Sequence, residues 1–221
     1  MSVPLFAFRG IEKSFSGSKI LRGTDLSLYP GKCILLSGKN GVGKTTLLKI
    51  IAGLETPEKV EIEYNGKINH WKKVVSSVRK EIIYLHQQPI MFSSSVESNV
   101  AYGLRFSSLN QKQRCESLEE ALVWAGLMDV AKKKARTLSG GVQQRVAFTR
   151  AWILKPKVLL LDEPMSNMDD ESQEKTFQLL ERVKSAGMSL VITSHFLHYL
   201  DGLADQKFQL KNGVLDLLNN S

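Results

Sequence analysis

GKNGVGKT, residues 38–45, is the stretch that decides the fold. It matches the pattern G-x-x-x-x-G-K-[S/T], with an apolar run at 32–37 before it and an apolar-faced helical pattern at 45–52 after it. We therefore expect a strand, a glycine-rich turn and a helix. Glycines let a backbone approach phosphates closely, and a helix N-terminus attracts negative charge. The stretch predicts a nucleoside triphosphate site.

The expected phosphate-binding residues run through this motif into the helix. Lys44 should reach the β- and γ-phosphates, and the Thr45 hydroxyl should bind magnesium. The full set in this stretch is Gly38, Lys39, Asn40, Gly41, Val42, Gly43, Lys44, Thr45 and Thr46. A glycine-rich turn without a ligand is the alternative, but a chance match occurs at about one position in tens of thousands. The motif names a ligand class, and many unrelated activities share it.

Length and composition bound the remaining possibilities. A chain of 221 residues with 43% hydrophobic residues can form one domain with a small subdomain. No apolar run approaches the roughly 18 residues of a membrane span, and the first ten residues show no secretory pattern. We therefore expect a cytosolic location. The two cysteines, Cys33 and Cys115, indicate free thiols and no disulfide framework.

The net charge of +8 raises the alternative of a nucleic-acid or anionic-lipid partner. The densest basic cluster comprises Lys132, Lys133, Lys134 and Arg136. It lies just before a turn-like segment and lacks interleaved aromatic residues, so it indicates a solvated helix end. We expect no direct contact with nucleic acid.

The order of strand and helix patterns predicts an α/β fold. Strands are expected at 32–37, 60–64, 81–85, 157–162 and 188–193, and helices at 45–52, 111–125, 141–154 and 171–186. Strands separated by helices indicate a mostly parallel sheet, here the core of a phosphate-loop NTPase. Short β segments at 3–28, with Gly17 and Gly23 in the turns, predict a flanking antiparallel region. Residues 89–137 predict an inserted helical subdomain, and Asn212-Gly213 predicts a terminal hairpin.

A second candidate site is the run VLLLDEP at 158–164, an apolar strand that ends in two acids. Beside the phosphate loop, Asp162 would hold magnesium, which prefers oxygen ligands. Glu163 would orient or deprotonate the attacking water. A strand cap before a proline turn is the alternative, and the pairing with the phosphate loop weighs against it.

LSGGVQQR, residues 138–145, resembles the signature motif of the ATP-binding cassette (ABC) family, and the acid-ended strand follows it as in that family. The resemblance covers essentially the whole chain as a single ABC ATPase domain. It implies that Ser139, Gly140 and Gly141 of one subunit face the phosphate loop of another, so that two ATP molecules lie in a head-to-tail pair. This pair would be a homodimer or two different cassettes.

The remaining family positions follow from the same resemblance. Phe15 aligns with the aromatic residue that stacks on adenine, and Gln87 aligns with the glutamine that contacts magnesium and water; Gln88 is the alternative. Asp169 aligns with the loop between the two nucleotide sites, and His195 with the switch histidine at the γ-phosphate. The implied catalytic residues are Glu163, His195 and Gln87, and the implied magnesium ligands are Thr45, Gln87 and Asp162. A metal site at His195 and His198 is disfavoured, since no third ligand is near them in the sequence.

The resemblance further implies an ATPase that couples ATP-driven closure of the pair to transport by a membrane permease. The chain would then lie on the cytoplasmic face of the membrane, with segment 88–105, including apolar Ile90, Met91 and Phe92, facing the permease. The sequence at 91–104 is similar to importers of oxyanions such as tungstate, molybdate or phosphate. An exporter-type ATPase and a soluble ABC ATPase of translation or DNA repair are the alternatives. A phosphate-loop kinase or GTPase would leave residues 138–145 unexplained.

Overall fold

The computed structural model describes residues 3–166, 168–194 and 197–218, which fall into two compact units. Unit 1 comprises Met1–Tyr84, Lys157–Glu163 and Lys184–Ser221, and unit 2 comprises Leu85–Pro156 and Pro164–Val183. The expected helical segment 89–137 lies within unit 2, which also contains α5 and most of α6. Each unit is described by itself.

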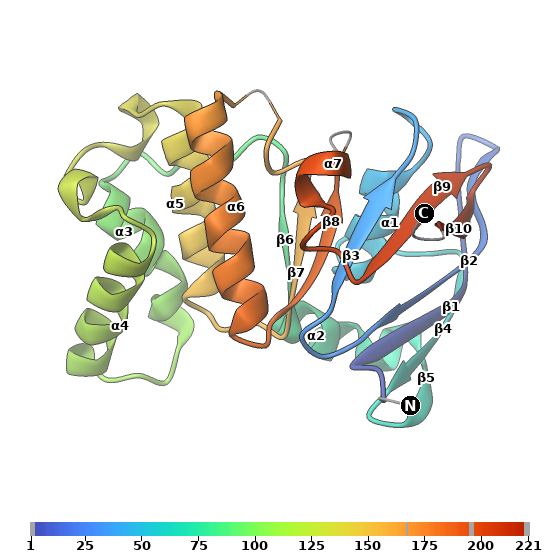
Figure 1. The fold of residues 1–221 in the computed structure, drawn as a ribbon. Helices are drawn as coiled ribbons and strands as arrows, with labels where there is room; N and C mark the ends of the chain where they lie inside the picture. Colours follow the sequence, from blue (N-terminus) through green and yellow to red (C-terminus); the bar gives the residue numbers. More distant parts are fainter. Residues whose placement is uncertain (1–2, 167, 195–196, 219–221) are drawn as a thin grey trace. The chain divides into compact units, whose positions relative to one another are not determined.

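The larger sheet of unit 1 has the strand order β10-β9-β3-β8-β7-β6 (Figure 1). Its strands are β3 (Cys33–Ser37), β6 (Ile82–Leu85), β7 (Val158–Asp162), β8 (Ser189–Thr193), β9 (Gln206–Lys211) and β10 (Val214–Leu218). β8 runs parallel to both β3 and β7, and β9 runs parallel to β3. Every residue of β3, β7 and β8 is buried, as continuous apolar runs require. The predicted α/β fold with a mostly parallel sheet is confirmed.

The smaller sheet of unit 1 is antiparallel, with the order β2-β1-β4-β5, as the opening segments predict. Its strands are β1 (Phe6–Phe15), β2 (Ser18–Leu28), β4 (Lys59–Tyr64) and β5 (Lys67–His70). The expectation of short segments separated by turns at Gly17 and Gly23 is wrong in one respect. Gly17 lies in the β1–β2 turn, but Gly23 lies inside β2, where the pairing with β1 shifts register between Ile11 and Glu12. Gly23 takes a φ of 84°, so it forms a bulge in a long strand.

The helices of unit 1 are α1 (Lys44–Ile51), α2 (Trp71–Glu81) and α7 (Leu197–Leu200). The terminal hairpin turns at Asn212 and Gly213, which both take positive φ as predicted for this dipeptide. The Gly213 carbonyl accepts hydrogen bonds from the Arg22 amide at 2.8 Å and the Thr24 hydroxyl at 2.7 Å. The hairpin is thereby fixed to β2 of the antiparallel sheet.

Unit 2 is helical. Its helices are α3 (Val96–Ala101), α4 (Gln111–Trp124), α5 (Gly140–Trp152) and α6 (Asp170–Ser185), with short 3₁₀ turns at Tyr102–Phe106, Met128–Val130 and Ala135–Thr137. A capping box between Asn110 and Gln113 starts α4. The Trp124 ring of α4 stacks on the Trp152 ring of α5 with centroids 4.2 Å apart, which locks these two helices together. No helix in the described part of the chain has both the length and the apolar character needed to cross a membrane.

Candidate functional site

The glycine-rich loop occupies the turn between β3 and α1 in unit 1. Gly38 has a φ of 144°, and a Cβ added there would lie 2.7 Å from the Leu210 carbonyl oxygen. Gly43 has a φ of 114°, and its added Cβ would lie 2.6 Å from Ile20 Cγ2. Only glycine fits these two positions. At Gly41 an added Cβ would meet nothing within 4 Å, so the loop is tightly packed at its ends and open at its middle.

Lys44, the first residue of α1, is only 6% exposed. Its ammonium donates hydrogen bonds to the carbonyl oxygens of Gly38 at 2.7 Å and Lys39 at 3.3 Å. The loop therefore wraps around a fixed positive charge at a helix N-terminus. Both features favour the binding of an anion at this point.

Asp162, at the end of β7, is the buried centre of a hydrogen-bond cluster in unit 1. Its carboxylate accepts hydrogen bonds from the hydroxyls of Thr45 at 2.7 Å, Tyr84 at 2.8 Å and Thr193 at 2.7 Å. The residue is 6% exposed, so these bonds compensate for the loss of water around the charge. The cluster joins the phosphate loop to the second acidic site that the sequence predicts.

Tyr84 and Thr193 are members of this cluster that the sequence analysis missed. Burial raises the pKa of the Tyr84 phenol well above its usual range, and the charge of Asp162 and the hydrogen bond to it act in the same direction. Tyr84 therefore remains a protonated donor at neutral pH. The position of these residues could have indicated their role. Both are polar residues at or near the ends of the predicted strands 81–85 and 188–193, which flank the strand that ends in Asp162.

Glu163 follows Asp162 and lies in the left-handed region with a φ of 48°. Side chains with a Cβ rarely adopt this conformation, and it costs on the order of 1 kcal/mol. The Glu163 amide donates a hydrogen bond to the Thr193 hydroxyl at 2.9 Å, which holds the turn in place. The backbone thus changes direction at the residue expected to act on water.

The side-chain oxygen atoms of Thr45 and Asp162 are suitable ligands for magnesium. The pair offers a hydroxyl and a carboxylate oxygen already in contact, and magnesium prefers oxygen ligands and keeps several of its waters. Within residues 3–166, 168–194 and 197–218, no group of three His, Cys, Asp or Glu side chains could hold a metal ion by itself. A magnesium ion at this pair would thus share its coordination with phosphate oxygens and water.

Other expected site residues lie in unit 2. Ser139 precedes α5 and is exposed, and its side chain makes no capping hydrogen bond. Gly140 is exposed as well, whereas Gly141 is buried, and a Cβ added at Gly141 would lie 2.6 Å from Ser172 Cβ of α6. The signature segment therefore presents a helix N-terminus, while Gly141 allows α5 and α6 to pack closely. Gln87 donates a hydrogen bond to the Ser166 hydroxyl at 3.3 Å.

Asp169 caps the start of α6 in unit 2, accepting hydrogen bonds from the Ser172 amide at 2.8 Å and hydroxyl at 3.2 Å. These bonds lower the pKa of Asp169. Phe15, in unit 1, ends β1 with 46% of its surface exposed and with the Lys13 ammonium 4.9 Å from its ring centre. His195 lies outside the described residues. The expected roles of these residues stay predictions.

The segment expected to face a permease has a mixed surface. Ile90 is 64% exposed and Phe92 is 36% exposed, whereas Met91 is buried. The Phe92 ring lies 4.5 Å from the Tyr102 ring, and the Arg150 guanidinium lies 5.0 Å from the centre of the Phe92 ring. Two of the three apolar residues are thus available at the surface of unit 2.

Comparison with known proteins decides the family. The sequence profile of the family described as "ABC transporter" matches residues 21–166. The chain belongs to the ABC transporter family. It is 34% identical over 221 residues to the spermidine/putrescine import ATP-binding protein PotA of Marinobacter nauticus, covering 99% of this chain and 58% of that protein. This chain therefore spans little more than half the length of that relative.

A second relative matches along nearly its whole length. The tungstate uptake system ATP-binding protein TupC of Peptoclostridium acidaminophilum is 32% identical over 204 residues, covering 92% of each protein. Among solved structures, cbiO1 from Clostridium perfringens, part of the ABC transporter complex cbiONQ, aligns with a TM-score of 0.87 and 26% identity, covering 97% of this chain and 87% of that one. A dimeric ATP-binding cassette in a post-hydrolysis state with ADP and phosphate aligns with a TM-score of 0.84 and 25% identity, covering 98% and 100%. The predicted ABC fold is confirmed.

Proposed function

We propose that this chain is the ATP-binding and ATP-hydrolysing subunit of an ABC importer for a small solute, acting with magnesium and a membrane permease. The observation that carries the proposal is the contact between the Thr45 hydroxyl of the phosphate loop and the Asp162 carboxylate, 2.7 Å apart. It joins the two elements that bind a nucleotide and its cation, and Glu163 is the next residue in the chain.

The roles of the residues follow from their chemistry. The amides of residues 38–45 and the Lys44 ammonium bind the phosphates, and Phe15 offers an exposed aromatic face for the adenine. Thr45, Asp162 and Gln87 are the residues that would hold magnesium, which when bound neutralises charge on the β- and γ-phosphate oxygens. Glu163 accepts a proton from the attacking water, and His195 contacts the γ-phosphate.

Unit 2 supplies the groups for a second nucleotide site. The exposed Ser139 hydroxyl and the N-terminus of α5 form an anion-binding end with no capping side chain at Ser139. We therefore infer that Ser139, Gly140 and Gly141 close over the nucleotide of a paired cassette, with Asp169 between the two sites. The dimeric cassette among the structural neighbours, which holds ADP and phosphate, supports this arrangement.

The importer part of the proposal rests on relatives. The proteins to which this chain is similar are named for import of spermidine and putrescine and for tungstate uptake, and cbiO1 is part of a transporter complex. Exposed Ile90 and Phe92 would contact a permease on the cytoplasmic face of the membrane. We favour an oxyanion as the substrate, because TupC, the relative named for tungstate uptake, aligns over 92% of this chain and 92% of its own length.

A Glu163→Gln substitution tests the catalytic assignment. The variant should bind ATP yet hydrolyse it about 10²–10⁴ times more slowly, because the amide cannot accept the proton. It should also form a dimer in the presence of ATP, measured by size-exclusion chromatography with light scattering. Glu116→Gln, which removes an exposed acid of α4, is the matched control. Unchanged turnover in the Glu163 variant would contradict the assignment.

The transport assignment has its own test. Affinity-tagged chain, purified from detergent-solubilised membranes of its source cells, should retain a permease, and the pair in lipid vesicles should accumulate the oxyanion only with ATP enclosed in the vesicles, on the side of the ATP-binding subunit. An Ile90→Asp, Phe92→Asp double variant should lose the permease and keep basal ATP binding. Retention of the permease by this variant would exclude the exposed apolar segment as the contact.

A further inference from the structure

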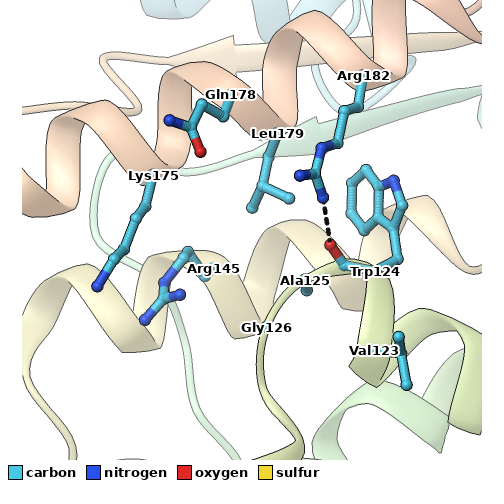
Figure 2. A pocket seen from close by; sticks show the side chains of 9 residues that line it. All are labelled: Val123, Trp124, Ala125, Gly126, Arg145, Lys175, Gln178, Leu179 and Arg182. Atoms are coloured by element: carbon cyan, nitrogen blue, oxygen red, sulfur yellow. Dashed lines mark hydrogen bonds between the residues drawn. The ribbon is translucent and has the colours of Figure 1, made fainter.

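Unit 2 contains a pocket of about 400 Å³ that none of the nucleotide-site residues line. It lies between the C-terminal end of α4 with the turn that follows, one side chain of α5, and one face of α6 (Figure 2). This volume is within the range of about 300–1,000 Å³ typical of small-molecule sites.

The lining carries three cationic side chains and no carboxylate. They are Arg145 of α5 and Lys175 and Arg182 of α6. Figure 2 shows Arg145 and Lys175 extending side by side at one end and Arg182 at the other. Two acids lie beside the pocket on α6: Glu171 forms an ion pair with Lys175, and Glu174 accepts a hydrogen bond from Gln178. The ion pair offsets the charge of Lys175, so the net positive charge comes from the two arginines.

The two guanidinium groups keep donors available for a ligand. Among the described residues, none accepts a hydrogen bond from the Arg145 guanidinium. Burial lowers the pKa of Arg145, and nearby Glu171 acts in the opposite direction. Arg182 donates one hydrogen bond, from Nη1 to the Trp124 carbonyl oxygen at 3.1 Å, and this bond orients the rest of its planar group. Guanidinium groups bind carboxylate and phosphate through paired hydrogen bonds.

Apart from Gln178, the remaining side chains of the wall are apolar. Leu179 is buried at the base, Val123 is 61% exposed at the rim, and Trp124 stands beside Arg182. The stacking of Trp124 on Trp152 fixes its ring before any ligand arrives. A preformed wall of this kind reduces the entropic cost of binding. The pocket is therefore suited to a molecule with an anionic head and a small apolar body.

We propose that this pocket binds a small organic anion, with a carboxylate or phosphate head bound by Arg182, an apolar body packed against Val123, Leu179 and Trp124, and Arg145 adding positive charge at the far end of the pocket. The site is distinct from the expected nucleotide site, because none of its lining residues is an expected nucleotide contact. It does not depend on the proposed transport function.

Phenyl phosphate is the probe for this site, and the indole N–H resonance of Trp124 in a ¹⁵N-labelled full-length chain is the reporter. The chain has three tryptophans, so Trp71→Phe and Trp152→Phe variants assign the resonances. The Trp124 resonance should shift in a saturable way below about 10 mM. Phenol, the neutral analogue, should cause no such shift, and inorganic phosphate should bind more weakly. Benzoate, run in parallel, separates carboxylate from phosphate as the preferred head.

Variants locate the site. Arg182→Gln should weaken the binding of phenyl phosphate by about tenfold or more, the loss expected for one charge-assisted hydrogen bond. Arg145→Gln, which removes a charge at the far end of the pocket, should weaken it less. Lys133→Gln removes an equal charge from an exposed position of unit 2 and should leave the affinity unchanged. Lys44→Ala should also leave it unchanged, because the nucleotide site is not involved. Arg182 is exposed, so its variant should remain folded, which thermal denaturation verifies.

Three outcomes would overturn the proposal. The first is no saturable shift of the Trp124 resonance, and the second is an equal shift with phenol. The third is an equal affinity in the Arg182→Gln and Lys133→Gln proteins. Loss of the shift in Lys44→Ala alone would assign the effect to the nucleotide site instead.

Discussion

In unit 1 the Asp162 carboxylate is buried and accepts three hydrogen bonds, whereas in unit 2 the Ser139 hydroxyl is exposed and caps no helix. The first group is positioned by its own fold before any nucleotide arrives. The second lacks an intramolecular capping role, which leaves it available for the contact with a paired cassette that we propose. In that proposal, one nucleotide site would use residues that contribute to the stability of the fold to different degrees.

The largest expected effect on stability comes from replacing Asp162, and it tests the contrast with Ser139 directly. Asp162→Ala should reduce the free energy of unfolding by about 2–4 kcal/mol, because it removes the carboxylate that accepts hydrogen bonds from the buried Thr193, the half-buried Tyr84 and the exposed Thr45. Ser139→Ala should change it by less than about 0.5 kcal/mol and lower ATPase activity instead. Urea denaturation and phosphate release measure the two quantities. An equal loss of stability in both variants would contradict the claim that Asp162 contributes more than Ser139 to the stability of the fold.

The close contacts of two glycines offer a second contrast. Gly43→Ala should destabilise unit 1 by about 2–3 kcal/mol, and Ile20→Ala should relieve it only in part, because the φ of 114° stays strained. Gly141→Ala in unit 2 should cost about 1–3 kcal/mol, which Ser172→Gly should largely relieve, since Gly141 does not have a positive φ. Double-mutant cycles from thermal denaturation give the coupling energies. A fully rescued Gly43 variant would refute the role of backbone strain.

A pH effect is expected in unit 1. Burial acts to raise the pKa of Asp205, but hydrogen bonds from the Cys33 amide, Lys184 and Lys32 outweigh it and lower the pKa to about 2. Because the folded pKa lies below the unfolded value of about 3.9, the carboxylate stabilises the fold above about pH 4. About 2 kcal/mol should be lost as the pH falls from about 4 to 2. Asp205→Asn should remove this part of the pH dependence in urea titrations.

The smallest effect should come from the exposed surface of unit 2. Lys112 and Glu116 form an i,i+4 pair on α4 with 3.9 Å between charged atoms and side chains that are 86% and 62% exposed. Glu116→Gln should change the unfolding free energy by less than about 0.5 kcal/mol. Differential scanning calorimetry provides the check. A larger loss would mean that surface charge contributes more to unit 2 than its burial indicates.

The sequence was sufficient where burial leaves a strong pattern. The runs that become β3, β7 and β8 are buried on both faces, so they are continuous and apolar and easily predicted. Helix α2 was missed because only Val74 and Val78 are buried in it, and β5 because none of its four residues is buried. Short or mostly exposed elements leave weak patterns.

The residues of the candidate site likewise fall into those that the sequence predicted and those that it did not. Motif spacing predicted Lys44, Thr45 and Asp162 as site residues, because each lies in a short sequence motif that can be recognised locally. Tyr84 and Thr193 were missed as partners of Asp162 because their contacts join strands distant in the sequence, at separations of 78 and 31 residues. Such pairings depend on strand order, and hydroxyl donors are common at strand ends for other reasons.

The left-handed backbone at Glu163 has an evolutionary consequence. Selection for stability alone would replace this residue with glycine, which adopts a φ of 48° without strain. A Glu163→Gly protein should therefore be at least as stable as the natural one. Any design procedure that optimises folding energy at this turn would thus tend to remove the acid, and a search for thermostable variants of this chain should hold position 163 fixed.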